Sequence, residues 1–271
     1  MIDLFKQLLS GGMIGTVYRV DLHDTTMMVV KVMSGEVANL DIEGYMLQYL
    51  AEHSQLPVPE IFYSTKTLLL MTYIEGNSSL PATVQEDAAE HLANLHAISA
   101  SHYGLKRDTL IGGLHQPNAQ NQSWIAFFRD QRILYMARKA LEEKQMPAEF
   151  YGRLEKFCDH LDHWISEPEQ PSLIHGDMWT TNILAQQGKI SGFVDPAIYY
   201  ADPEIELAFS TLFGTFGRTF FARYNEIRPI SAGFMDTRKD IYNLYPLLVH
   251  VRLFGAGYLS GIDQTLRRFG Y

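Results

Sequence analysis

The feature that most constrains the fold is a change in hydrophobic periodicity about a quarter of the way along the chain. Up to residue 75, apolar and β-branched residues come in short runs typical of strands, and beyond it they recur at helical spacing. The polar stretch Glu75 to Ser79 separates the two parts. We therefore predict an α+β protein of two lobes, with a small β-rich N-lobe (1–75) and a larger, mainly helical C-lobe (76–271).

The first part predicts two pairs of strands around one helix. A polar turn separates the first two β-rich runs, as in a hairpin, and prolines end the helix that follows. The predicted strands are Thr16 to Val20, Met27 to Met33, Glu60 to Tyr63 and Leu68 to Ile74, and the predicted helix is Asp41 to Glu52.

The second part is predicted to be helical with a single hairpin. Apolar residues at helical spacing predict helices at Thr83 to Ser99, at Ser123 to Lys144, around Phe157 to Trp164, and over most of the chain from Glu204. The hairpin is predicted from two strand-like runs on either side of Gln186-Gln187-Gly188.

Composition limits the partners and the compartment. A net charge of −9 gives little electrostatic support for binding nucleic acid or an anionic membrane. Cys158 is the only cysteine, so an intrachain disulfide is excluded and a reducing cytoplasm is expected. No apolar run approaches the ~18 residues of a membrane span, and the first residues do not resemble a signal peptide. We expect a cytoplasmic protein, as a monomer or a weak dimer.

The most specific chemical pattern is His175-Gly176-Asp177, followed by Asn182 and then by Asp195 after an apolar strand. A carboxylate and a carboxamide five residues apart allow one loop to present a hydroxyl-proton acceptor and a magnesium ligand together. A second carboxylate at a strand end supplies another hard oxygen ligand. The ordered set predicts metal-assisted phosphoryl transfer, with Asp177 as base and with Asn182 and Asp195 as metal ligands.

A glycine-containing turn before the first predicted strand is a weaker indication of phosphate binding. Gly11, Gly12 and Gly15 would let backbone N–H groups approach phosphate oxygens. The spacing matches neither the full G-x-G-x-x-G pattern nor a Walker A sequence, and a plain turn into a hairpin explains it equally well.

A lysine inside an apolar strand is a stronger indication. Lys31 would be costly to bury unless an anion pairs with it, although an edge strand would let it face water. Glu43, on the following helix, is the favoured partner, with Glu36 as a competitor. In the strand that leads to the lobe boundary, Met71 and Tyr73 complete the residues that we expect around the nucleotide.

Other candidate sites are weaker. His91 and His96 are five residues apart, not at the four-residue spacing of a helical zinc pair, and His96 is expected to be a core residue. His175 is not followed by a Gly-x-Ser-x-Gly nucleophile turn, so a role in orienting the loop is favoured. A group of phenylalanines is expected to form helix core: Phe209, Phe213, Phe216, Phe220 and Phe221.

The motifs together resemble the aminoglycoside phosphotransferase and choline kinase superfamily, and more narrowly the fructosamine kinase (ketosamine-3-kinase) family. The narrower resemblance depends on a tryptophan two residues after Asp177 and on Asp-Pro-Ala in place of Asp-Phe-Gly. Matching segments extend over most of the chain: Tyr103-Gly104, Gln116-Pro117-Asn118, Trp124, Phe127-Phe128, Gln131-Arg132, Asp195-Pro196-Ala197, Tyr200 to Glu204, Leu212 to Gly214, Tyr242 to Tyr245 and Leu253 to Gly255.

The resemblance implies a protein-kinase-like fold and a reaction that uses ATP and Mg²⁺. It implies phosphorylation of the sugar 3-hydroxyl of ketosamines on amines or proteins, giving an unstable product that releases the sugar. By analogy Asp177 is the base, Asn182 and Asp195 hold magnesium, Lys31 pairs with the phosphates and Glu43 orients it. Trp179, Gln116, Asn118 and Asp202 are implied on the substrate side.

The chain also departs from related families. Thr180-Thr181 replaces the Ser-Gly common before Asn182, which affects the expected sugar pocket. The glycine turn lacks the cysteine that lets some members form a redox-controlled dimer. Gly176 stands where protein kinases have arginine, and no Ala-Pro-Glu segment follows, so activity without activation-loop phosphorylation is expected. The alternatives are an aminoglycoside, choline or other small-molecule kinase of the same fold, a protein kinase, and an inactive nucleotide-binding scaffold.

Overall fold

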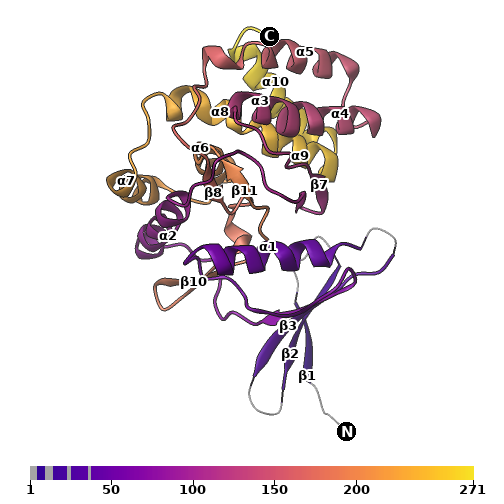
Figure 1. Ribbon diagram of the computed structural model, residues 1–271, viewed down its shortest axis with the longest axis vertical. Coiled ribbons are helices and arrows are strands. Elements are labelled where there is room, and N and C mark those ends of the chain that lie inside the picture. Colours follow the sequence, from indigo (N-terminus) through magenta and orange to yellow (C-terminus); the bar gives the residue numbers. More distant parts are fainter. Residues whose placement is uncertain (1–4, 10–14, 23–25, 36–37) are drawn as a thin grey trace.

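The N-terminal part of the computed structural model is a five-stranded antiparallel sheet with one helix beside it (Figure 1). The structure describes residues 5–9, 15–22, 26–35 and 38–271. The strands lie in the order β1-β2-β3-β5-β4, and α1 contacts β4 and β5. The elements are β1 (Phe5–Leu9), β2 (Thr16–Asp21), β3 (Met27–Val32), α1 (Leu40–His53), β4 (Ile61–Ser64) and β5 (Leu68–Thr72).

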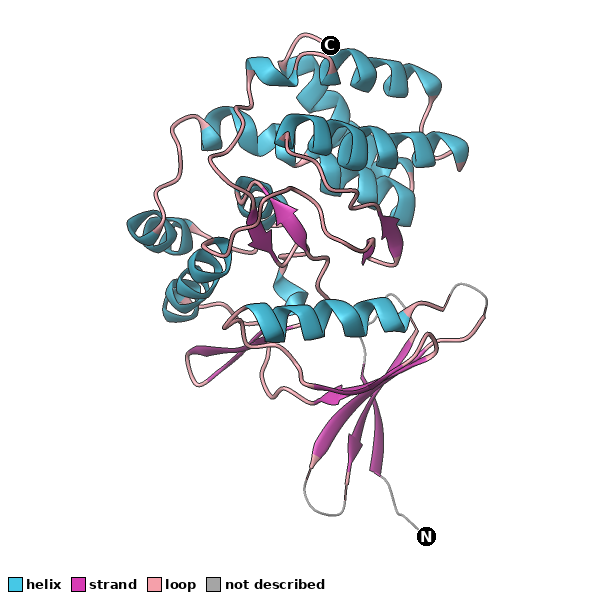
Figure 2. Cartoon of the chain, viewed as in Figure 1, coloured by secondary structure: helices cyan, strands magenta, loops and turns pink. Residues whose placement is uncertain are grey.

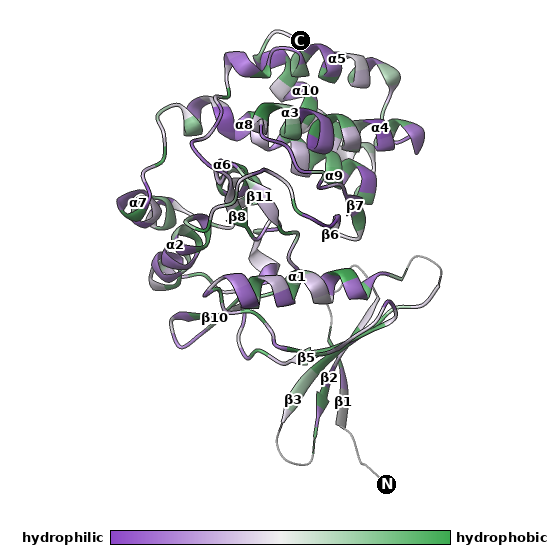
Figure 3. Ribbon diagram, viewed as in Figure 1, coloured by the Kyte–Doolittle hydropathy of each residue, from purple (hydrophilic) through white to green (hydrophobic). Residues whose placement is uncertain are grey.

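Strand periodicity explains the small core between this sheet and α1. Val29 and Lys31 are the buried residues of β3, as their two-residue spacing predicts. The apolar members of this core come from β3, β5 and α1: Val29, Leu69, Met71, Leu40 and Leu47. Figure 3 shows β3 coloured mostly as hydrophobic. The buried Lys31 side chain therefore adjoins a core that is otherwise apolar.

The C-terminal part is mainly helical and encloses the larger core (Figure 2). Its helices are α2 (Ala82–His96), α3 (Trp124–Phe128), α4 (Leu134–Glu142), α5 (Ala148–Cys158), α6 (Glu204–Leu212), α7 (Arg218–Ile227), α8 (Lys239–Tyr242), α9 (Leu244–Phe254) and α10 (Leu259–Arg268). Three short antiparallel pairs complete it, formed by β6 (Thr109–Ile111) with β7 (Leu114–Gln116), β8 (Ser172–Ile174) with β11 (Tyr199–Ala201), and β9 (Ile183–Gln186) with β10 (Lys189–Phe193). The predicted two-lobe fold is confirmed.

Two helix predictions need correction. The helix predicted from Ser123 to Lys144 contains a π-helical segment, Arg129–Ile133, in which the fully buried Arg132 donates to the Pro117 carbonyl and to Asn118. Such a widened turn is typical where a side chain has a special role. The helix predicted around Phe157 to Trp164 lies earlier in the chain, as α5, because Pro147 starts it. Residues 161–163 form only a single 3₁₀ turn.

The β9–β10 hairpin contacts both the N-lobe and the segment that joins the two lobes. Asn77, in the segment between β5 and α2, pairs with Ala185 of β9 through backbone hydrogen bonds of 2.8 and 3.0 Å. The Phe193 N–H of β10 donates to the carbonyl of Pro57, which follows α1. These bonds fix the end of β10, and therefore Asp195, next to the N-lobe. Within the described residues, no helix has the length and apolar character needed to cross a bilayer.

Candidate active site

The loop after β8 is held against a second loop through Gly176. The Ala197 N–H donates to the His175 carbonyl at 2.7 Å, which brings the two backbones into contact. Gly176 has φ +85°, and a β-carbon there would overlap the carbonyl oxygen of Ala197. Only glycine fits a position that combines left-handed backbone with such close approach.

We expect Gly176→Ala to lower the free energy of unfolding by about 1–3 kcal/mol or more, because the new methyl group meets backbone that cannot rotate away. Urea unfolding measures this. Gly152→Ala in α5 is the matched control, since a β-carbon there meets nothing within 4 Å, and alanine favours a helix over glycine by about 1 kcal/mol. Equal stability of Gly176→Ala and wild type would contradict the close packing of the two loops.

Glu206 of α6 anchors the backbone of the same loop. Its Oε1 accepts the Gly176 N–H at 2.6 Å, and its Oε2 accepts the His175 N–H at 3.3 Å. The Nε2–H of His96 also donates to Oε2, at 2.8 Å, and the Tyr224 hydroxyl donates to Nδ1 of His96 at 2.7 Å. Although burial alone would raise the pKa of Glu206, the His96 hydrogen bond and the loop N–H groups hold it below its usual value.

The sequence interpretation assigned no role to Glu206. The signal that could have identified it is its place between Ile205 and Leu207 in an apolar helix, because a buried carboxylate needs partners. His96 is buried in the core, as predicted.

The side chain of His175, the first residue of this loop, does not line the cleft. Its Nε2–H donates to the Val194 carbonyl at 3.1 Å, and its Nδ1 accepts the Asp177 N–H at 3.4 Å. Burial lowers the pKa of His175, which favours the neutral ring that these two bonds require. This geometry supports a role in orienting the loop.

The base and the two metal ligands predicted from the sequence lie close together. Asn182 donates through Nδ2 to Oδ2 of Asp177 at 3.0 Å and to the Asp177 carbonyl at 2.9 Å. Asp195 follows β10 with φ +53°, a strained conformation typical of functional positions. All three residues line one cleft. Carboxylate and carboxamide oxygens are the donors that Mg²⁺ prefers, so the set fits this metal.

Burial, together with the nearby negative charge of Asp195, raises the pKa of Asp177 to about 7. A divalent cation between the two groups would act in the opposite sense and favour the ionised carboxylate. The pKa of Asp177 therefore depends on whether a cation neutralises the charge of Asp195.

Lys31 joins the sheet to this cleft. Its Nζ lies 2.6 Å from Oε1 of Glu43 and also contacts Oδ1 of Asp195. Burial alone would lower the pKa of Lys31, but the two carboxylates raise it, so the ammonium stays charged. Lys31 is 6% exposed, which excludes the edge-strand alternative, and the predicted pairing with Glu43 is present. Glu36, the competing partner, lies outside the described residues, as do Gly11 and Gly12.

The other described residues predicted for the nucleotide do not line the cleft. Gly15, with φ +76°, packs against β3, where a β-carbon would come within 2.6 Å of the Val32 carbonyl oxygen. Met71 is buried in the core between the sheet and α1. Tyr73 lies beneath the guanidinium of Arg19, 4.8 Å from the ring centre, and lines a separate pocket beside residues 75–81.

On the substrate side, the structure brings only Trp179 to the cleft. Gln116 and Asn118 are fully buried. Gln116 donates to the Thr109 hydroxyl and to the Ala197 carbonyl, and accepts the Tyr245 hydroxyl. Gln116 thereby supports the loop after Asp195, and neither Gln116 nor Asn118 lines the cleft.

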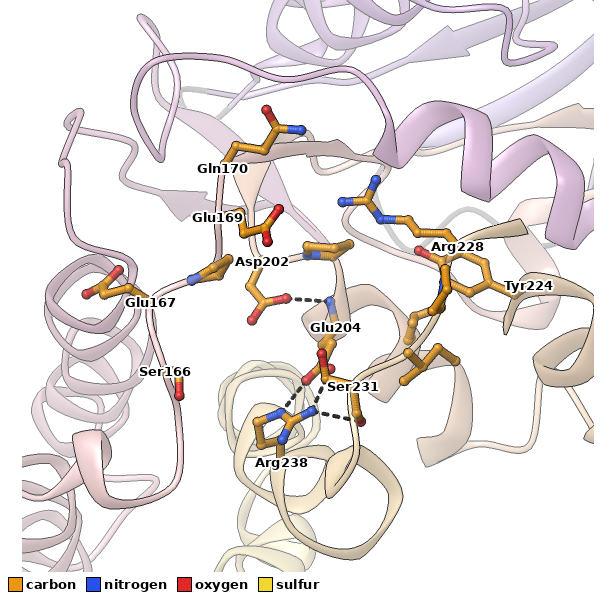
Figure 4. Close-up of a pocket in the computed structure, with 15 residues that line it drawn as sticks. Ser166, Glu167, Glu169, Gln170, Asp202, Glu204, Tyr224, Arg228, Ser231 and Arg238 are labelled. Carbon is orange, nitrogen blue, oxygen red and sulfur yellow. Dashed lines mark hydrogen bonds and ion pairs between the residues drawn. The ribbon is translucent and has the colours of Figure 1, made fainter. Parts of the chain in front are cut away.

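Asp202 lies in a different pocket, shown in Figure 4, where it accepts the Glu204 N–H and the Tyr242 hydroxyl. The β6–β7 turn lines the cleft instead, through Gly112 and Gly113, both with positive φ. A Gly-Gly pair between apolar residues is a hairpin signal that the sequence interpretation missed.

Lys31 of the antiparallel sheet pairs with Glu43 of α1 and faces Asp177, Asn182 and Asp195. This arrangement defines a protein-kinase-like phosphotransferase. The chain belongs to the fructosamine kinase family, whose model matches residues 4–269. It is 31% identical over 271 residues to a probable ketoamine kinase of Vibrio parahaemolyticus, covering 97% of this chain and 91% of that protein.

Solved structures agree with the family. A Thermobifida fusca protein, assigned provisionally as a fructosamine-3-kinase, has a TM-score of 0.86 and 31% identity, covering 97% of this chain and 92% of that one. The aminoglycoside phosphotransferase APH(4)-Ia, in a complex with ADP and hygromycin B, has a TM-score of 0.70 at 18% identity, covering 98% and 95%. The second likeness shows the fold alone.

Proposed function

We propose that this chain is an ATP- and Mg²⁺-dependent kinase that phosphorylates the 3-hydroxyl of ketosamines, the sugar adducts of amines and proteins, and so takes part in deglycation. The observation that carries the proposal is the convergence of Lys31, Glu43, Asp177, Asn182 and Asp195 on one cleft, in a chain of the fructosamine kinase family. The cytoplasm as compartment and a monomer or weak dimer as assembly stay predictions.

Each group has a role in this proposal. The N-lobe (1–75) holds the nucleotide, with Lys31 on the phosphates and Glu43 orienting it. Asn182 and Asp195 hold magnesium, which when bound neutralises phosphate charge. The C-lobe (76–271) holds the acceptor, so that Asp177 accepts the proton of the attacking hydroxyl. In this arrangement positioning and electrostatics supply most of the rate enhancement.

The substrate class is tested by offering four acceptors side by side with ATP and Mg²⁺: fructosyl-lysine, ribulosyl-lysine, kanamycin and choline. We expect phosphate transfer to one or both ketosamines and none above background to the others. A clear preference for kanamycin or choline would overturn the ketosamine assignment. No transfer to any of the four, with nucleotide still bound, would favour the inactive scaffold.

A further inference from the structure

A second cavity, of about 510 Å³, lies in the C-lobe and shares no lining residue with the catalytic cleft. It is bounded by residues 166–170, by the first turn of α6, and by the segment that follows α7 (Figure 4). Its volume is within the range of small-molecule sites, roughly 300–1,000 Å³. Apart from the segment Tyr200 to Glu204, no motif interpreted from the sequence falls on it.

The cavity carries a guanidinium without a carboxylate partner. The Arg228 guanidinium donates one hydrogen bond in the described structure, to the Ser172 hydroxyl at 3.2 Å, and forms no ion pair with any described residue. Arg238, in the same cavity, is instead held by both oxygens of Glu204, at 2.6 and 2.7 Å. Arg228 is therefore the cation that remains available to a carboxylate ligand.

Negative charge lies on the opposite wall. Figure 4 shows Arg228 extending toward the wall that carries Glu169 and Asp202. The exposed Glu169 side chain forms no ion pair or hydrogen bond with the described part of the chain. Asp202 is only 7% exposed and accepts one hydrogen bond on each oxygen, which leaves further acceptor capacity on both.

We propose that this cavity binds a free α-amino acid, with Arg228 on its carboxylate and with Glu169 and Asp202 on its ammonium group. Opposite charges that face one cavity without pairing with each other match a zwitterion better than a simple anion or cation. Four carboxylates against two guanidinium groups line the cavity, so its net charge favours an amino acid with a cationic side chain, such as L-lysine, over L-glutamate.

One wall of the cavity connects to the catalytic loop. Tyr224 lines the cavity and its hydroxyl is hydrogen-bonded to Nδ1 of His96. His96 is hydrogen-bonded through Nε2 to Glu206, whose carboxylate accepts the N–H of Gly176. This contiguous hydrogen-bonded path gives a ligand in the cavity a physical route to the catalytic loop. For the proposed ketosamine kinase, the bound amino acid would belong to the class of amines that deglycation releases.

Calorimetric titration of the full chain with L-lysine tests the site, in the absence of ATP and of any ketosamine. We expect saturable binding that weakens at least tenfold in Arg228→Gln and in Glu169→Gln. Arg218→Gln, on the first residue of α7 and outside the cavity, is the matched control and should bind as wild type does. L-Glutamate should bind more weakly than L-lysine. Because no kinase substrate is present, this outcome does not depend on the proposed function.

Two results would overturn the proposal. Cadaverine, which has the amines without the carboxylate, would bind as well as L-lysine if the cavity merely attracted cations. Absence of L-lysine binding to wild-type protein at millimolar concentration would exclude the site altogether. The connection to the loop has its own readout, since saturating L-lysine should change turnover in wild type and not in Arg228→Gln. Unchanged turnover with binding intact would refute that connection.

Discussion

Asp177→Asn is expected to lower turnover by about 10²-fold or more while the fold and the affinity for nucleotide remain close to those of wild type. The amide keeps the shape of the side chain but cannot accept the proton of the attacking hydroxyl. The Asn182 amide donates to one oxygen of Asp177, and the carbonyl oxygen of the substituted amide can accept the same hydrogen bond, so the loop keeps this contact.

Steady-state kinetics with a saturating acceptor, together with nucleotide titration, separates the two effects. Asp162→Asn, an exposed aspartate in the 3₁₀ turn after α5, is the matched control and should leave both quantities unchanged. Normal turnover in Asp177→Asn would show that another group accepts the proton.

Glu206→Gln is expected to lower turnover by up to about 10²-fold, although Glu206 does not line the cleft, because a displacement of about 1 Å in the catalytic loop has effects of this size. The carboxylate accepts from Gly176, His175 and His96 at once. A glutamine side chain must turn its N–H₂ group toward at least one of these donors, which leaves a buried group unpaired at a cost of about 1–3 kcal/mol.

The measurement is kcat and KM at a temperature well below the unfolding midpoint, with urea unfolding in parallel. A positioning role lowers kcat more than it raises KM for ATP, whereas simple destabilisation lowers the free energy of unfolding and leaves kcat of the folded fraction unchanged. Glu90→Gln is the control, since Glu90 of α2 pairs with Arg223 at the surface. Wild-type kcat in Glu206→Gln would remove Glu206 from the account of the loop.

The division of the chain into a sheet and a helical part could be predicted because it depends on periodicity over long windows. The six-residue strands β2 and β3 carry that pattern themselves, whereas the five-residue β1 was not predicted. The three-residue strands β6, β7, β8 and β11 are too short to show it; β8 and β11 pair across a long stretch of chain, whereas β6 and β7 form a local hairpin. Local spacing therefore gave the lobes but missed the hairpin whose turn lines the cleft.

The same contrast applies to the site. Asp177, Asn182 and Asp195 could be identified because their order along the chain reflects a loop and a strand end, and Lys31 because an apolar strand surrounds it. Glu206 is distant in sequence from the loop that it holds, so only the fold reveals its partners. Gln116 and Asn118 were selected through family resemblance, which marks residues needed for packing as readily as residues that touch a substrate.

The most direct test of the central claim is the position of the phosphate in the product. Wild-type protein is incubated with ATP, Mg²⁺ and fructosyl-lysine, and the product is examined by ³¹P–¹H correlation NMR before it decomposes. The account predicts phosphate on the 3-hydroxyl of the sugar, formed about 10²-fold or more slowly with Asp177→Asn. Phosphate on another hydroxyl, or ATP hydrolysis without transfer, would contradict it.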